Sequence, residues 1–152
     1  STKFIELAGE INRSMPYHVV NRLIESLNAR FSKSIKGANV LVLGLAYKKN
    51  VDDIRESPAL KIIEILEQKG ANISFYDPYV QKIPNLREHP TLIGRSGVLL
   101  NKDTIQKCDV AFIVTDHDNV DYQMLVDYCP LVVDTRNAIE NAGIKSGKVV
   151  KA

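Results

Sequence analysis

The chain has 152 residues, of which 45% are hydrophobic and 25% charged, enough to bury the core of about one domain. Its formal net charge is only +2 and its basic residues are scattered, which argues against a nucleic-acid-binding protein. No apolar run approaches the ~20 residues that cross a membrane, and no signal-peptide core opens the chain, so we expect a cytoplasmic protein. Cys108 and Cys129 do not suggest a disulfide framework, and we expect both to be small buried hydrophobes.

The first segment, residues 3–31, is predicted to be helical because its apolar residues recur three or four positions apart. Pro16 interrupts this pattern and should either kink the helix or start a second one. A helix this long is more than one small sheet needs, which favours a connector or a self-association surface. The apolar stripe consists of Phe4, Ile5, Ala8, Ile11, Met15, Val19, Leu23 and Leu27.

The stretch from Asn39 to Pro58 organises the rest of the chain. Its apolar run 40–43, closed by Gly44, is typical of a strand buried on both faces. A charged loop follows, and Ser57 and Pro58 then favour the start of a helix. Basic loop residues beside a helix N-terminus suit an anion such as a phosphate.

The remaining segments alternate between strand and helix, which predicts a doubly wound α/β fold with a parallel sheet. The segment 81–95 is broken by prolines and a glycine and is expected to be mostly loop. Helices are predicted at 59–69, 103–107 and 122–128, and strands at 73–76, 97–100, 110–114, 131–134 and 149–150.

Polar clusters follow three of the predicted strands, at residues 47–55, 115–118 and 134–137. Parallel strands would bring these clusters to one rim of the sheet, where ligands of open α/β folds bind. Lys48, as a point charge, and Arg136, as a planar fork, are therefore candidates to hold a diphosphate. Each alone would more simply be a solvated loop charge, but three clusters on one rim favour a ligand site.

Several chemistries find no support in the sequence. No G-x-G-x-x-G follows a strand, and no G-x-x-x-x-G-K-[ST] is present. His117 beside two aspartates is weak evidence for a metal, and we expect no metal site. Asp52 and Asp53 could be general bases, but next to Lys49 and Arg55 they are more simply partners in loop ion pairs. We find no nucleophile with an adjacent base and assign no catalytic residue.

The sequence L-V-L-G-L-A-Y-K-K-N-V-D-D-I-R-E-S-P-A-L, residues 41–60, resembles the C-terminal part of the UDP-glucose/GDP-mannose dehydrogenase family. The resemblance covers essentially the whole chain. Within the family, the motifs of this chain look most like those of the branch that acts on UDP-N-acetylhexosamines. Supporting motifs are N-x-x-M-P at 12–16, F-Y-D-P-Y at 75–79, T-D-H at 115–117 and V-V-D-T-R-N at 132–137.

The resemblance implies a Rossmann-like doubly wound parallel sheet preceded by a long helix. Residues 1–31 would be the end of a central dimerisation helix, and 37–152 a C-terminal UDP-sugar-binding domain. The implied enzyme oxidises C6 of a UDP-N-acetylhexosamine or UDP-hexose to a uronic acid with two NAD⁺, which an N-terminal domain mainly binds. The family's catalytic cysteine segment and N-terminal G-x-G-x-x-G have no match here, so we expect this chain alone to be inactive.

Family roles carry over to four positions of this sequence. Tyr47 and Lys48 match loop residues that contact the UDP-sugar, and Arg136 matches an arginine that contacts the sugar nucleotide. Arg55 matches an arginine that reaches the NAD held by the other domain. The resemblance also implies a homodimer through the N-terminal helix, without nucleic-acid or membrane partners. The alternative is a stand-alone nucleotide-binding module that performs no chemistry.

Overall fold

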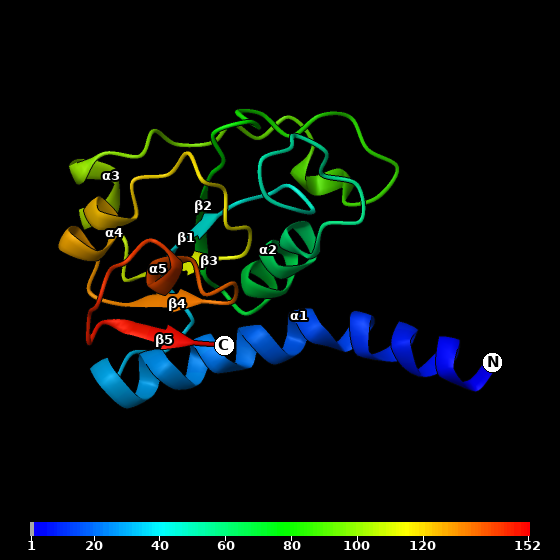
Figure 1. The fold of residues 1–152 in the computed structure, drawn as a ribbon, viewed down its shortest axis with the longest axis horizontal. Coiled ribbons are helices and arrows are strands. Elements are labelled where there is room, and N and C mark those ends of the chain that lie inside the picture. Colours follow the sequence, from blue (N-terminus) through cyan, green and yellow to red (C-terminus); the bar gives the residue numbers. More distant parts are fainter. Residues whose placement is uncertain (1) are drawn as a thin grey trace.

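A parallel β-sheet forms the centre of the molecule (Figure 1). The computed structural model describes residues 2–152, apart from the side chains of residues 2, 4 and 8–12. Within that range, five strands lie in the order β2-β1-β3-β4-β5, and every neighbouring pair is parallel. This confirms the predicted Rossmann-like α/β class. The strands are β1 (Asn39–Leu43), β2 (Asn72–Tyr76), β3 (Val110–Ile113), β4 (Val132–Asp134) and β5 (Val149–Lys151).

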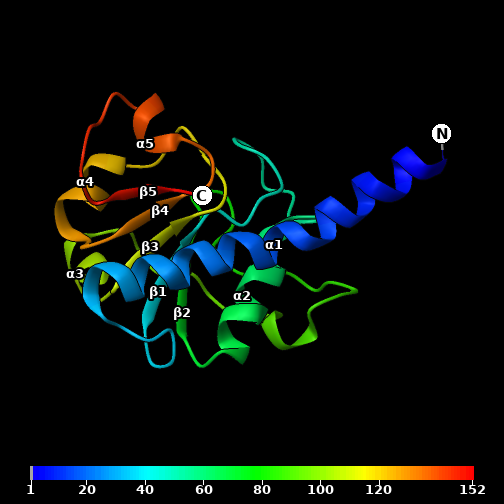
Figure 2. The same ribbon diagram turned by 90° about the horizontal axis from the view of Figure 1, so that it is seen from below.

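Helices cover both faces of the sheet. Helices α1 (Thr2–Phe31) and α2 (Pro58–Gln68) pack on the face formed by Val40 and Val42. The short helices α3 (Lys102–Gln106), α4 (Tyr122–Tyr128) and α5 (Ala138–Asn141) pack on the opposite face. Successive strand residues point to opposite faces, so the wholly apolar run of β1 supplies both cores. Figure 2 shows α1 crossing in front of the strands.

Helix α1 continues through Pro16, so the alternative of a second helix starting there is wrong. Its later turns bury Val20, Leu23 and Leu27 completely, and this packing offsets the backbone hydrogen bond that proline removes. Ile5, by contrast, is 70% exposed. Three members of the predicted stripe, the side chains of Phe4, Ala8 and Ile11, lie outside the described residues. Among the described residues, no helix is long and apolar enough to cross a membrane.

Two segments differ from the sequence-based expectation. Residues 97–100 form no strand, and this region contributes only an isolated antiparallel bridge between Lys82 and Ser96. Gly97 packs against the Phe75 ring, and its N–H donates to the Gln81 carbonyl rather than to a ladder. Helix α5 was not predicted, because four residues give too little periodicity. The segment 81–95 is mostly loop, as expected, with one 3₁₀ turn, η1 (Pro90–Leu92).

Candidate functional site

Four strands of the sheet end at the same level. Leu43 of β1 pairs with both Tyr76 of β2 and Ile113 of β3, and Ile113 pairs with Asp134 of β4. The polar clusters that follow these strands therefore leave from one edge, which confirms the arrangement expected from parallel pairing. We call this edge the carboxyl rim; it comprises residues 44–50, 77–79, 115–118 and 135–137.

A buried carboxylate, Asp77, organises the start of the loop after β1. Its Oδ2 accepts hydrogen bonds from the backbone N–H groups of Leu45 at 2.7 Å and Ala46 at 3.2 Å. Its Oδ1 accepts from the N–H of Tyr79 at 2.8 Å. Burial raises the pKa of Asp77, but hydrogen bonds from His117 and the backbone outweigh it and bring the pKa below its ordinary value. Asp77 is therefore an ionised acceptor that ties β1 to β2.

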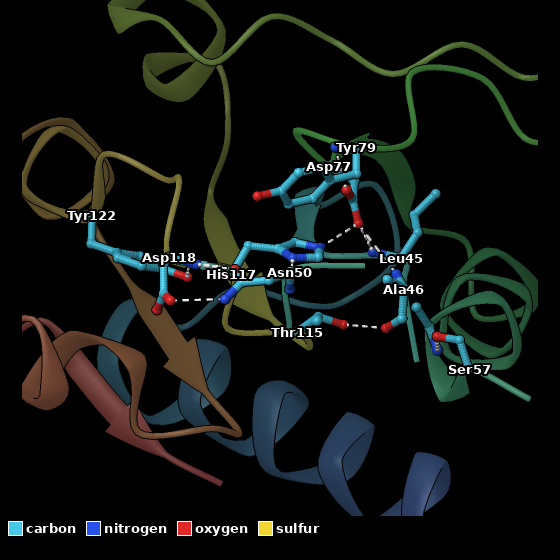
Figure 3. Close-up of polar contacts among 11 residues, drawn as sticks. Leu45, Ala46, Asn50, Ser57, Asp77, Tyr79, Thr115, His117, Asp118 and Tyr122 are labelled. Atoms are coloured by element: carbon cyan, nitrogen blue, oxygen red, sulfur yellow. Dashed lines mark hydrogen bonds and ion pairs between the residues drawn. The ribbon is translucent and has the colours of Figure 1, made fainter. Parts of the chain in front are cut away.

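His117 is fully buried beside Asp77 (Figure 3). Its Nδ1 accepts the N–H of Asn50 at 2.8 Å, so this nitrogen carries no proton. The proton is on Nε2, which donates to Asp77 Oδ2 at 2.8 Å. The ring is thus a neutral imidazole. Both nitrogens have partners, which leaves none for a metal, and the described residues contain no cluster of three or more metal-ligating side chains.

Asn50 fixes the far end of the same loop. Its side-chain Nδ2 donates to Asp118 Oδ2 at 2.8 Å, and its Oδ1 accepts from the Asp118 N–H at 3.0 Å. The backbone of Asn50 is left-handed, with φ 64°, a conformation that asparagine tolerates better than most residues. The loop is therefore held at both of its ends.

Tyr47 and Lys48 lie between these two anchors. The Lys48 Nζ is 5.5 Å from the centroid of the Tyr47 ring, which is a cation–π contact. Tyr47 is 40% exposed and Lys48 is also exposed, so both can meet a ligand. The backbone of Tyr47 is fixed by its N–H, which donates to the Asp53 carbonyl at 2.9 Å.

Arg136 lies on the same rim at the end of β4. Its backbone N–H donates to Asp134 Oδ1 and its Nε to the Val114 carbonyl, both at 3.0 Å. Strand β3 separates β4 from β1, so a strand spacing of about 4.8 Å puts the ends of β1 and β4 about 10 Å apart. The loops that carry Lys48 and Arg136 therefore leave the sheet from one rim. Arg136 lines a shallow cleft formed by residues 134–137, Lys151 and Ala152, and Lys48 is not among the lining residues, so a pocket shared by Lys48 and Arg136 stays a prediction.

Arg55 lies outside the rim, before the start of α2. Its Nε and NH2 donate to the two oxygens of Asp53 at 3.0 and 2.8 Å, which confirms the ion pair expected for Asp53. The ion pair expected for Asp52 stays a prediction. These hydrogen bonds lower the pKa of Asp53 to about 2. Arg55 also lines a cleft of about 450 Å³ between the 54–57 segment and the 85–89 loop. The structure thus separates Arg55 from the pocket that contains Arg136.

Two organising residues, Asp77 and Asn50, were not identified from the sequence. A signal was present for Asp77, because an aspartate directly follows the apolar run of β2 as Asp134 ends that of β4. Both carboxylates are buried and accept backbone N–H groups of the next loop. Asn50 gave no such signal, because its partner Asp118 is 68 positions away.

The parallel sheet carries basic and hydrogen-bonding side chains on one rim, where its strands end. This arrangement defines a Rossmann-like ligand-binding domain. Residues 41–141 match the UDP-glucose/GDP-mannose dehydrogenase family, UDP binding domain, and the chain belongs to this family. The match confirms the resemblance that the 41–60 motif suggested.

Similar proteins are dehydrogenases of UDP-sugars. The chain is 31% identical to UDP-N-acetyl-D-mannosamine dehydrogenase from Methanococcus maripaludis, over 99% of this chain and 34% of that protein. It is 34% identical to UDP-glucose 6-dehydrogenase TuaD from Bacillus subtilis, over 89% of this chain and 29% of that protein. The solved structure of UDP-D-ManNAc dehydrogenase from Pyrococcus horikoshii superposes with a TM-score of 0.75 and 28% identity, covering 97% of this chain and 32% of that one. The chain thus spans about a third of the length of these relatives.

Proposed function

We propose that this chain is the UDP-binding part of an NAD-dependent UDP-sugar 6-dehydrogenase. The full enzyme would oxidise C6 of a UDP-N-acetylhexosamine or UDP-hexose to a uronic acid, using two NAD⁺. The observation that carries this proposal is the family match over residues 41–141, which spans both the loop of Lys48 and the strand end of Arg136. In this proposal, residues 37–152 form the UDP-sugar-binding domain and 1–31 the end of a dimerisation helix.

The chemistry of the rim fits a nucleoside diphosphate. Lys48 offers a mobile ammonium and Arg136 a planar guanidinium, the two groups that proteins use to bind phosphate oxygens. The exposed Tyr47 ring offers a flat apolar surface beside Lys48. These three residues are the proposed contacts to the UDP-sugar.

The proposed role of this chain toward NAD is small. When bound, NAD⁺ would accept the hydride from C6, but this sequence contains no glycine fingerprint to cradle a dinucleotide. Arg55, held on the surface by Asp53, is the residue proposed to reach an NAD bound mainly by another domain. Cys108 and Cys129 are buried and do not serve as the nucleophile, so the chain by itself is proposed to be inactive. Dehydrogenase relatives that align with nearly the whole chain favour this proposal over a stand-alone binding module.

Calorimetric titration with UDP tests the proposal. We expect saturable UDP binding that Lys48→Ala weakens by about tenfold, because a charge-assisted hydrogen bond is lost. Lys69→Ala is the matched control, because this exposed lysine follows the C-terminal end of α2, away from the carboxyl rim. Saturable binding of UDP that is absent for UMP would locate recognition at the diphosphate. An absence of any saturable UDP signal in the chain and in an enzyme that contains it would refute the proposal.

Self-association through α1 is proposed from its exposed apolar side chains. Ile5 and Leu7 are 70% and 55% exposed, and apolar surface of this kind is often covered by a partner. Sedimentation velocity should show a dimer that Ile5→Glu and Leu7→Glu together dissociate. Leu99→Glu is the control, because Leu99 is 76% exposed but lies far from α1 in the sequence and outside any helix. A monomer at every concentration would contradict the proposal.

A further inference from the structure

The segment 45–50, which carries Tyr47 and Lys48, is held by groups from two other loops. At its start, the Leu45 and Ala46 N–H groups donate to Asp77, and the Ala46 carbonyl accepts from Thr115 Oγ1 at 2.6 Å. At its end, the Asn50 N–H donates to the ring of His117. The segment has no regular secondary structure of its own. Its conformation is therefore determined by these contacts, together with the Asn50–Asp118 hydrogen bonds and the Tyr47 N–H bond to the Asp53 carbonyl.

His117 connects the two ends of this segment through one rigid ring (Figure 3). Its Nε2–H donates to the same Asp77 oxygen that accepts from Leu45, while its Nδ1 accepts from Asn50. The ring is itself immobilised by an edge contact with the Tyr79 ring, whose centroid is 5.0 Å away. The exposed fraction of His117 is 0%, and hydrogen bonds shielded from water in this way are stronger than exposed ones.

We propose that His117, as its neutral Nε2–H tautomer, is a positioning residue for nucleotide binding. It fixes the segment 45–50 before the ligand arrives, so that Tyr47 and Lys48 are presented in one conformation. A loop that must become ordered on binding loses affinity, whereas a pre-organised loop does not. The inference rests on the proposed function, because it assigns His117 a role in binding the same nucleotide.

His117 itself does not contact the nucleotide in this proposal. Its ring is buried, both of its nitrogens have protein partners, and its carbonyl accepts from the Tyr122 hydroxyl at 2.7 Å. Its effect on binding must therefore pass through the segment 45–50, and the one atom of the ring that contacts this segment directly is Nδ1, at the Asn50 N–H. This makes the Nδ1 acceptor, rather than the size of the side chain, the decisive feature.

Two substitutions at His117 separate the functions of its two nitrogens. In His117→Asn, the amide Oδ1 can take the place of Nδ1 and still accept the Asn50 N–H. In His117→Gln, the amide nitrogen can take the place of Nε2 and still donate to Asp77, but the acceptor for Asn50 is lost. Asp77 keeps three backbone donors in either variant, so the start of the segment stays anchored.

We expect UDP affinity to fall by about tenfold in His117→Gln and by no more than about twofold in His117→Asn. Amide hydrogen exchange gives a readout that needs no ligand. The Asn50 N–H should be protected in the wild type and in His117→Asn, and should exchange faster in His117→Gln. Thermal unfolding of both variants shows whether a loss of affinity merely follows a loss of stability. Equal UDP affinities in the three proteins, or weaker binding by His117→Asn, would overturn the inference.

Measurements on the unmodified protein decide the case in which neither variant folds. Long-range ¹H–¹⁵N spectra should show His117 protonated at Nε2 and not at Nδ1. A proton on Nδ1, or rapid exchange of the Asn50 amide, would overturn the inference. If the wild type fails to bind UDP while these two signatures are present, the proposed function fails and His117 remains only an anchor of the loop.

Discussion

A β-carbon on Gly44 would lie only 2.4 Å from the Cβ of Thr115 and 2.7 Å from its backbone nitrogen. The backbone of Gly44 also has φ +91°, a conformation that residues with a side chain rarely adopt. The glycine therefore allows the first loop of the carboxyl rim to pass directly against the loop after β3. Thr115 uses this proximity, because its hydroxyl reaches the Ala46 carbonyl.

We predict that Gly44→Ala lowers the free energy of unfolding by about 2–4 kcal/mol, because the left-handed backbone and the overlap with Thr115 both add strain. Chemical denaturation measures this loss. Gly143→Ala is the control, because Gly143 has φ +77° but no atom within 4 Å of an added β-carbon. It should cost only about 1 kcal/mol. Equal losses in both variants would mean that contact with Thr115 contributes nothing.

Arg136→Lys should weaken UDP binding by about tenfold, although it keeps the positive charge. A lysine cannot donate to the Val114 carbonyl and present a planar fork to phosphate at the same time. Calorimetric titration with UDP measures the change. Arg13→Lys on the exposed surface of α1 is the control and should bind like the wild type. Unchanged affinity in Arg136→Lys would remove Arg136 from the proposed site.

The stability of the fold should decrease on acidification, partly through Asp77. Its pKa is lower in the folded protein than the ordinary value of about 3.9, so its stabilising contribution is complete above that value. The contribution is lost as the pH falls through the lower folded pKa. We therefore predict that Asp77→Asn costs about 2 kcal/mol at pH 7 and makes stability less dependent on pH below about 5.

Denaturation curves between pH 7 and pH 2 test the role of Asp77. Asp127→Asn serves as the control, because Asp127 is exposed and its carboxylate accepts a hydrogen bond from the nearby Gln123 side chain. That variant should follow the wild-type curve. A parallel loss of stability in Asp77→Asn at all pH values would show that the ionised carboxylate is not the stabilising group.

Both cysteines should be unreactive in the folded protein. Burial raises the pKa of the Cys129 thiol to about 11 and also raises the pKa of Cys108. Both are free and buried, as the sequence suggested. A thiol reagent at pH 8 should label neither residue within minutes, and should label both in denaturant. Rapid labelling of Cys129 in the folded protein would contradict the predicted lack of reactivity and would make Cys129 a candidate nucleophile.

Sequence patterns predicted those parts of the fold that local forces determine. The apolar run of β1 and the Ser57–Pro58 start of α2 were identified because burial and helix capping act over a few residues. The common rim followed from parallel pairing alone. The pairing of Asp77 with His117 could not be predicted, because it joins residues 40 positions apart and depends on strand register.

The two errors in the predicted secondary structure have the same cause, because each depends on contacts that the local sequence does not determine. Residues 97–100 look like a strand from composition, but nothing in the sequence indicates that Gly97 packs against the Phe75 ring instead of entering the ladder. Helix α5 begins at Ala138, directly after Asn137, whose backbone is left-handed in the turn after β4. Such turns depend on the sheet that supports them.

Helix α1 joins an exposed end to a buried one without an interruption. The turns containing Leu23 and Leu27 are part of the sheet's core, and Arg22 and Arg30 donate to carbonyls in the last strand region. A protein or domain that bound the exposed turns near Ile5 would therefore also determine the orientation of the whole sheet. The helix thus connects its exposed end rigidly to the core. Cleavage of the chain after Phe31 would remove core residues together with the exposed turns.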